Sequence, residues 1–94
     1  MSVARVTTIN FKTKEAADNT VQSYSENAPT EFPEAEQLLQ VRAGDTTVVA
    51  ISLYADNEAM ERASAARSKR ISANQDQFES IDAKTGEVTL NHSN

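Results

Sequence analysis

The chain has 94 residues, no cysteine and a net charge of −5. Because about 100–200 residues make one domain, we expect a single domain over residues 1–94. The lack of cysteine excludes disulfides and thiolate metal sites, and an acidic chain is a poor match for nucleic acid, which requires a basic surface. No run approaches the roughly 18 apolar residues of a membrane-spanning helix, and the first residues lack the apolar stretch of a signal peptide. We therefore expect a cytoplasmic protein without a membrane partner.

Bulky apolar residues are scarce but clustered. Val, Ile, Leu and Phe together make up 18 of the 94 residues, just under the roughly 20% below which a strongly charged chain is expected to be disordered. Of these 18, 13 fall in four short segments typical of β-strands, at residues 3–11, 35–43, 47–54 and 87–92. Gly44-Asp45 predicts a hairpin turn between the second and third segments, and Lys84-Thr85-Gly86 predicts a turn before the fourth.

Two helices are predicted between these strands. The first begins at the N-cap residue Thr13, carries an apolar stripe and ends near Pro29, because proline disfavours the helical conformation of the residue before it. Its stripe consists of Ala17, Val21, Tyr24 and Ala28. The second helix begins at Asp56 and carries acidic residues early and basic residues late, as the helix dipole favours. Its inner face is predicted to hold Met60, Ala63, Arg67 or Ala66, Ile71, Asn74 and Phe78.

The predicted order is strand, helix, strand, strand, helix, strand. Two split βαβ units of this kind form the ferredoxin-like α+β fold, an antiparallel sheet with both helices on one face. Residues 47–54 place apolar side chains on both faces of their strand, which is typical of a strand covered on two sides. A second copy is the simplest cover for the face without helices, so we expect a two-fold homodimer that packs sheet against sheet.

This pattern resembles the dimeric α+β barrel superfamily, especially its antibiotic-biosynthesis-monooxygenase-like group. The resemblance rests on the element order, the length, the Gly44-Asp45 hairpin and a last strand that begins near Gly86. It covers almost the whole chain and implies a dimeric barrel with a cavity between the sheet and the helices of each protomer. Characterised members of that group include oxygenases that oxidise an electron-rich aromatic substrate without a cofactor, and haem-degrading enzymes, whereas other members have no established activity. Haem-degrading members have an Asn late in the first strand, where Asn10 stands, but their iron-binding histidine on a helix has no counterpart.

Five residues are candidates for site chemistry. His92 is the only histidine and hence a candidate general acid or base, although near a chain end it could simply be solvated. Asn10 is the second catalytic candidate, or a polar residue at the end of its strand. Arg42 could bind an anionic or phenolic ligand bidentately, or form an ion pair at the sheet edge. Tyr24 and Tyr54 could line a cavity and hydrogen-bond a ligand, or pack in the core.

Charge is also unevenly distributed. Residues 15–36 carry six carboxylates and no Lys or Arg, whereas residues 62–70 carry four basic side chains and no acid. These stretches could meet on partner chains or be two solvated helix faces. With only Gly44 and Gly86 as glycines, a Gly-rich phosphate loop is excluded, and the spacing of acidic residues suggests no metal site.

Two functions remain open at this point. The first is a monooxygenase-like enzyme without a cofactor, or a binding protein, for a small apolar or aromatic molecule. The second is a non-catalytic homodimer whose cavity is filled by its own side chains and whose surface serves interaction or stress-response roles.

Overall fold

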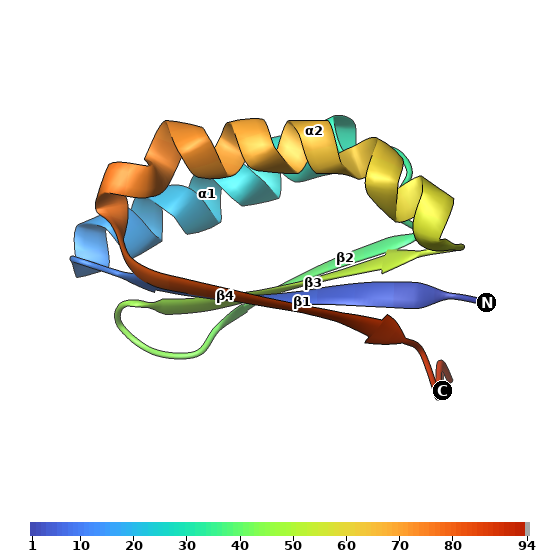
Figure 1. Ribbon diagram of the computed structural model, residues 1–94. Helices are drawn as coiled ribbons and strands as arrows, with labels where there is room; N and C mark the ends of the chain where they lie inside the picture. The colour runs from blue at the N-terminus through green and yellow to red at the C-terminus, as the bar shows by residue number, and fades with distance from the viewer. Residues whose placement is uncertain (94) are drawn as a thin grey trace.

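A four-stranded antiparallel sheet carries two helices on one of its faces (Figure 1). The computed structural model describes residues 1–93. The strands lie in the order β2-β3-β1-β4. In chain order the elements are β1 (Val3–Phe11), α1 (Lys14–Glu31), β2 (Gln37–Arg42), β3 (Thr47–Tyr54), α2 (Asn57–Asn74), the 3-10 turn η1 (Gln75–Gln77) and β4 (Phe78–Glu87). The predicted ferredoxin-like α+β fold is therefore confirmed.

Both helices begin at the predicted N-caps. The Thr13 hydroxyl accepts a hydrogen bond from the Ala16 N–H at 3.0 Å, and the Asp56 carboxylate accepts one from the Ala59 N–H at 2.8 Å. Each cap satisfies one of the amide groups that the first turn of a helix leaves unpaired. The two caps fix where the chain leaves the sheet and turns back over it.

Helix α1 continues through Pro29 and ends at Glu31. The proline lies in the last turn, so its missing N–H removes one hydrogen bond near the C-terminal end of the helix. The Phe32 N–H donates to the Ala28 carbonyl at 2.9 Å and closes the helix. Phe32 is buried, with 6% of its surface exposed, and anchors the chain as it turns into β2.

The predicted fourth strand, at residues 87–92, is wrong. The strand instead spans residues 78–87 and pairs with β1, and Gly86 lies within it opposite Ala4 rather than in a turn. Beyond Glu87 one backbone bond continues the pairing, from the Val88 N–H to the Ser2 carbonyl at 2.9 Å. Strand β4 lies at the edge of the sheet, and nearly all of its side chains are exposed, so it needs few apolar residues. For this reason the search for clusters of bulky apolar residues did not identify it as a strand.

The prediction that Phe78 lies on the inner face of the second helix is also wrong. The turn η1 ends the helical segment, so Phe78 is the first residue of β4 and not a residue of the inner helix face. Its ring meets Phe11 edge-on, with the ring centres 5.4 Å apart and an interplanar angle of 79°. This contact closes one end of the space between the sheet and the helices.

The buried apolar residues form two separate clusters. One cluster lies at the β3–α2 end of the fold and contains Val3, Ala28, Phe32, Tyr54, Ala59, Met60 and Ala63. The other lies near the start of α1 and contains Phe11, Ala17 and Val48. The core is thus divided, and the middle of the layer between sheet and helices is left for other side chains.

The other face of the sheet has no helix over it (Figure 1). Register places Val6 of β1 opposite Ile51 of β3, and Ile51 opposite Leu39 of β2. Val6, Leu39 and Val41 are 40%, 46% and 48% exposed, high values for bulky apolar residues. Apolar residues on both faces of β3 are therefore confirmed. On the open face the apolar residues of β1, β2 and β3 lie beside one another, whereas β4 contributes polar residues such as Asp82 and Lys84.

Over residues 1–93, neither helix is long and apolar enough to cross a membrane.

Candidate functional site

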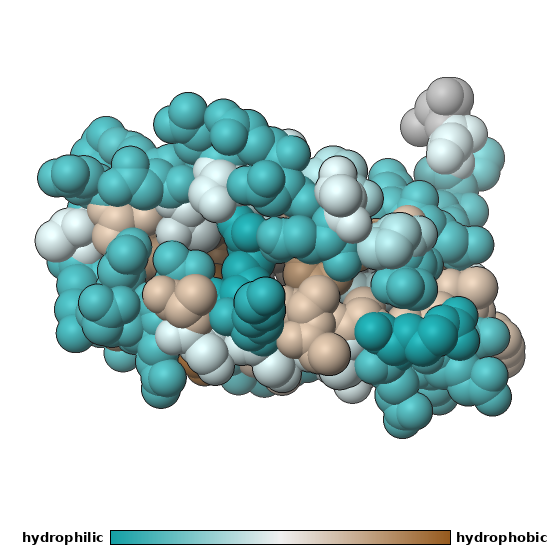
Figure 2. All heavy atoms as spheres, turned by 90° about the horizontal axis from the view of Figure 1, so that it is seen from above, coloured by the Kyte–Doolittle hydropathy of each residue, from teal (hydrophilic) through white to brown (hydrophobic). Residues whose placement is uncertain are grey.

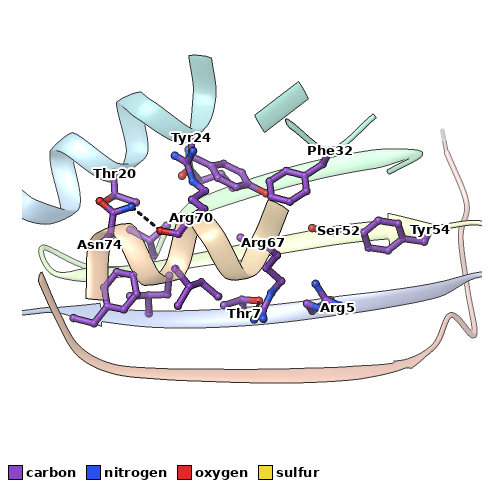
Figure 3. Close-up of a pocket in the computed structure, with 16 residues that line it drawn as sticks. Arg5, Thr7, Thr20, Tyr24, Phe32, Ser52, Tyr54, Arg67, Arg70 and Asn74 are labelled. Atoms are coloured by element: carbon purple, nitrogen blue, oxygen red, sulfur yellow. Dashed lines mark hydrogen bonds between the residues drawn. The ribbon is translucent and has the colours of Figure 1, made fainter. Parts of the chain in front are cut away.

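A cavity of about 80 Å³ lies between the sheet and the helices, in the gap between the two core clusters (Figure 3). All four strands and both helices contribute to its wall, β4 through Phe78. Its polar side chains are Arg5, Thr7, Thr20, Tyr24, Gln40, Ser52, Tyr54, Arg67, Arg70 and Asn74, and its apolar side chains are Ile9, Phe32, Val48, Ala50, Ile71 and Phe78. Seen from the helical side, apolar surface shows between polar side chains (Figure 2).

Small residues in the middle of the sheet create this cavity. On the helix-facing side, Thr7 of β1 lies opposite Ala50 of β3. The larger side chains Phe11 and Tyr54 lie at opposite ends of the same face and are almost fully buried, at 2% and 1% exposure. Since close packing depends on side-chain volume, short side chains at the centre leave space that the ends do not.

Two arginines enter the cavity from opposite walls. Figure 3 shows Arg67 reaching from α2 toward Thr7, with Arg5 beside them on β1. Arg67 Nη2 lies 3.4 Å from the Thr7 hydroxyl, and Arg5 Nη1 is buried without a hydrogen-bond partner. Within residues 1–93 neither arginine forms an ion pair; the four ion pairs found use Lys14, Arg42, Arg70 and Lys84.

The pKa of Arg67 reflects this lack of compensation. Burial lowers the pKa of Arg67, and the positive charge of Arg5 lowers it further. A guanidinium group loses its proton only far above neutral pH, so Arg67 keeps its positive charge in spite of this shift. The cavity therefore contains two positive charges with no acid beside them.

A third arginine, Arg70, is compensated. Its Nη1 donates to both carboxylate oxygens of Glu31 on α1, at 2.8 and 3.1 Å, and its Nη2 donates to the Ser23 hydroxyl at 3.1 Å. The guanidinium also lies 5.2 Å from the centre of the Tyr24 ring, a cation–π distance. The Asn74 amide donates to the Arg70 carbonyl at 2.9 Å (Figure 3). Arg70 thus joins the two helices beside the cavity.

Of the predicted site residues, both tyrosines line the cavity. The Tyr24 ring lies 6.4 Å from Phe32, and burial raises the pKa of the Tyr24 hydroxyl, although a hydrogen bond with Ser52 opposes this. Tyr24 is therefore a neutral hydrogen-bond donor at physiological pH. No histidine or carboxylate is among the lining residues, so the cavity wall has no group that accepts a proton near neutral pH.

Asn10 is directed to a different part of the molecule. Its amide donates to the Ser80 hydroxyl at 3.0 Å, and its carbonyl oxygen accepts from the Thr47 hydroxyl at 2.7 Å. These two partners lie opposite Asn10 on β4 and β3, on the row that faces away from the helices. Asn10 therefore links three strands at the open face and does not line the cavity.

Arg42 and His92 also lie outside the cavity. Arg42 forms an ion pair with Asp18 at 2.9 Å and donates to the carbonyls of Gly44 and Asp45 at 2.7 and 2.6 Å. Together with Lys14, it lowers the pKa of the exposed Asp18 carboxylate. His92 follows the end of β4, is exposed and belongs to no regular element.

The basic run at residues 62–70 divides between different surroundings. Arg62 and Lys69 are exposed, whereas Arg67 lines the cavity and Arg70 pairs with Glu31 of the acidic stretch. The two charged stretches therefore meet within one protomer through one ion pair. Across residues 1–93, acidic residues and the histidine form no cluster of three or more that could hold a metal ion.

Arg5 and Arg67 were not selected as site residues from the sequence, although a signal was present. Arg5 is separated from Val3 and Thr7 by one residue on each side, so it shares the inward face of β1 with them. The predicted inner face of the second helix holds Met60, Ala63 and either Arg67 or Ala66, while Arg67 also belongs to the basic run at residues 62–70. A charged residue at an inward-facing position of two different elements is the signal that was missed.

Comparisons with known proteins find similar folds among solved structures but no similar sequence. No family model matches the sequence, and no curated protein matches it significantly. Solved structures match over nearly the whole chain. NE2512, a protein of unknown function from Nitrosomonas europaea, aligns with a TM-score of 0.82 at 12% identity, over 99% of this chain and 94% of that one.

Two further structures bear on the expected fold. A dimeric ferredoxin-like protein from an uncultured marine organism aligns with a TM-score of 0.78 at 8% identity, over 99% of this chain and 92% of that one. A single-residue variant of SnoaB, a cofactor-independent oxygenase from Streptomyces nogalater, aligns with a TM-score of 0.71 at 19% identity, over 96% and 95%. At the level of fold, the resemblance to the monooxygenase-like group is confirmed.

Proposed function

We propose that this protein is a homodimer whose protomers each bind a small aromatic molecule in the cavity between sheet and helices, and oxidise it without a cofactor. The cavity itself is the observation that carries the binding function. It combines aromatic walls, from Tyr24 and Phe32, with convergent hydrogen-bond donors, which is the usual composition of a small-molecule site.

The cavity volume limits the size of the ligand. At about 80 Å³ it is roughly half of the ~150 Å³ cavity that accommodates benzene. A small aromatic ring with a short polar substituent has about eight heavy atoms, more than the six of benzene, so wall side chains must move outward for it to bind. A polycyclic ligand would require a much larger displacement. We therefore expect a ligand with few heavy atoms.

The reaction class is supported by the fold that the chain shares with SnoaB, a cofactor-independent oxygenase. Dioxygen would be the oxidant, and the substrate would supply the electrons. Because the cavity wall offers no proton acceptor near neutral pH, the substrate must be bound as an anion or lose its proton to water. Neighbouring guanidinium groups favour the ionised form of such a substrate.

The homodimer is supported by the open face of the sheet. Its apolar residues on β1, β2 and β3 form one continuous surface, and exposed apolar patches of this kind mark interaction sites. A two-fold interface uses the same patch on both copies, which suits a sheet face that is apolar along its centre. One of the structurally similar proteins is described as dimeric.

A non-catalytic homodimer is the second candidate. Two observations favour it: the small cavity volume and the absence of a histidine or carboxylate from the cavity wall. In that case the protein would bind a small molecule, or only water, without converting it.

Calorimetric titration with furan-2-carboxamide, a small neutral aromatic probe, tests the binding function. We expect one site per protomer in the wild type and none in Ala50→Leu, whose larger side chain fills the cavity from β3. Ala65→Leu, at an exposed position of α2, is the matched control and should bind as the wild type does. Equal binding by Ala50→Leu would show that the cavity is not the site.

Oxygen uptake tests the reaction class. With catechol as a small electron-rich substrate, and with no added metal or flavin, the wild type should consume dioxygen faster than buffer and faster than Ala50→Leu. If catechol binds but dioxygen consumption does not increase, the proposed oxidation is wrong and the non-catalytic function is supported.

A further inference from the structure

The uncompensated arginines are the feature of this cavity that binding of a neutral molecule does not explain. In a chain with a net charge of −5, acids are plentiful, yet Arg5 and Arg67 have none beside them. Arg5 Nη1 is buried with no hydrogen-bond partner, and the Arg67 guanidinium donates a long hydrogen bond of 3.4 Å to the Thr7 hydroxyl.

Such an arrangement is costly for the empty protein. A charged group that is removed from water loses hydration, and without a counter-charge it regains little. The positive charge of Arg5 adds repulsion to this cost at Arg67. Proteins keep strained or uncompensated groups mainly where a ligand or reaction uses them.

The remaining cavity wall also favours an anion. It contains no carboxylate that would repel a negative ligand, and it adds donors at Thr7, Tyr24 and Ser52. Resting on the binding function proposed above, we propose that the cavity recognises a small carboxylate, whose two oxygens lie between the guanidinium groups of Arg5 and Arg67. Arginine presents paired N–H groups that match carboxylate oxygens.

The two arginines come from different layers of the fold, which gives the site its specificity. Arg5 belongs to β1 and Arg67 to α2, and the two side chains meet near Thr7 (Figure 3). A carboxylate held between them joins the sheet to the helical layer. The rest of the ligand then lies against Tyr24, Phe32 and Ala50, where the wall is aromatic or small.

A pair of nearly isosteric probes tests this proposal on the full-length protein. Furan-2-carboxylate and furan-2-carboxamide have similar shapes and differ in charge. We expect the carboxylate to bind about tenfold more tightly or better, because hydrogen bonds to charged groups are stronger than neutral ones. Carboxamide affinity equal to carboxylate affinity would overturn the proposal and leave the proposed function standing. Absence of binding by both probes would overturn both.

Charge-matched variants locate the effect. Arg67→Gln should lose about tenfold in carboxylate affinity and change carboxamide affinity by less than about twofold. Arg62→Gln removes the same charge from an exposed position of α2 and should bind both probes as the wild type does. Arg67→Lys keeps the charge without the paired N–H groups and should give an intermediate carboxylate affinity. Unchanged carboxylate affinity in Arg67→Gln would contradict the proposal.

The stability of the unliganded protein separates a binding role from a structural one. Because Arg67 is partly buried and repelled by Arg5, Arg67→Gln should unfold at the same urea concentration as the wild type or a higher one. A large fall in that midpoint would show that Arg67 supports the fold instead. Arg5→Gln is the second variant and should show the same loss of carboxylate preference, so the test does not depend on one substitution.

Discussion

Arg70 on α2 contacts both carboxylate oxygens of Glu31 on α1, at 2.8 and 3.1 Å, in an ion pair that is partly shielded from water. The pair connects two helices that share few other polar contacts. It also shows that the chain compensates a cavity arginine where the role is structural, in contrast to Arg5 and Arg67.

Breaking this pair should destabilise the protein. Glu31→Gln leaves Arg70 partly buried without its counter-charge, and we expect the free energy of unfolding to fall by about 1–2 kcal/mol. Asp82→Asn is the control, because the Asp82–Lys84 pair is largely exposed and such pairs contribute about 0–1 kcal/mol. Urea denaturation of the three proteins measures the difference. Equal losses in both variants would contradict a special role for the helix-bridging pair.

A charged residue in the open sheet face should disrupt the dimer. Leu39→Lys places an ammonium group on the apolar face, on β2 beside Ile51 of β3, where a second copy would bury it at high cost. In equilibrium sedimentation we expect a dimer for the wild type at micromolar concentration and a monomer for Leu39→Lys. Ala65→Lys, on the exposed surface of α2, should remain dimeric. A monomeric wild type would refute the proposed interface.

Tyr24 predicts a specific alkaline response. Burial raises its pKa above the ordinary value of 10.0, so near pH 10 the folded protein keeps a proton that the unfolded chain releases. Stability from this group is therefore complete below about pH 9 and is lost as pH rises through the folded pKa. As pH rises above about 10, the unfolding free energy of the wild type should therefore fall relative to that of Tyr24→Phe, which urea denaturation at a series of pH values measures.

Absorbance of ionised tyrosine near 295 nm provides an independent check on Tyr24. Tyr24→Phe should remove a component that titrates above the ordinary tyrosine range. Removal of a component that titrates at or below that range would contradict the burial argument.

Asn10 and His92, the two catalytic candidates from the sequence, lie outside the cavity, so their substitution should not affect ligand binding there. Asn10→Ala breaks hydrogen bonds to Thr47 and Ser80 on the open side of the sheet, and His92→Ala alters an exposed residue after β4. Both variants should bind furan-2-carboxylate within about twofold of the wild type, although Asn10→Ala should be less stable by about 1 kcal/mol. A tenfold loss in either variant would place that residue in the site.

Much of the fold could be predicted from the sequence because local chemistry marks it. The hydroxyl of Thr13 and the carboxylate of Asp56 mark two helix starts, and β-branched residues mark β1 and β3. The fourth strand could not be found in this way, because an edge strand that pairs only with β1 needs few apolar residues. Phe78 and Ile81 are its two bulky apolar residues, and the Ile81 side chain is 40% exposed.

The site was harder to predict than the fold. Tyr24 and Tyr54 were selected as aromatic residues with a polar group, and both line the cavity. Arg5 and Arg67 lie 62 positions apart in the sequence and meet only because α2 packs across β1. These two arginines are notable because no acidic side chain within residues 1–93 forms an ion pair with them. The sequence alone does not show which side chains lie near each other in the fold, so it does not show this.

A crystal structure of the protein with furan-2-carboxylate at saturating concentration tests the central claim most directly. We predict one ligand in each protomer's cavity, with its carboxylate oxygens within hydrogen-bond distance of the guanidinium groups of Arg5 and Arg67. An empty cavity at saturation, or a ligand bound elsewhere on the molecule, would contradict it.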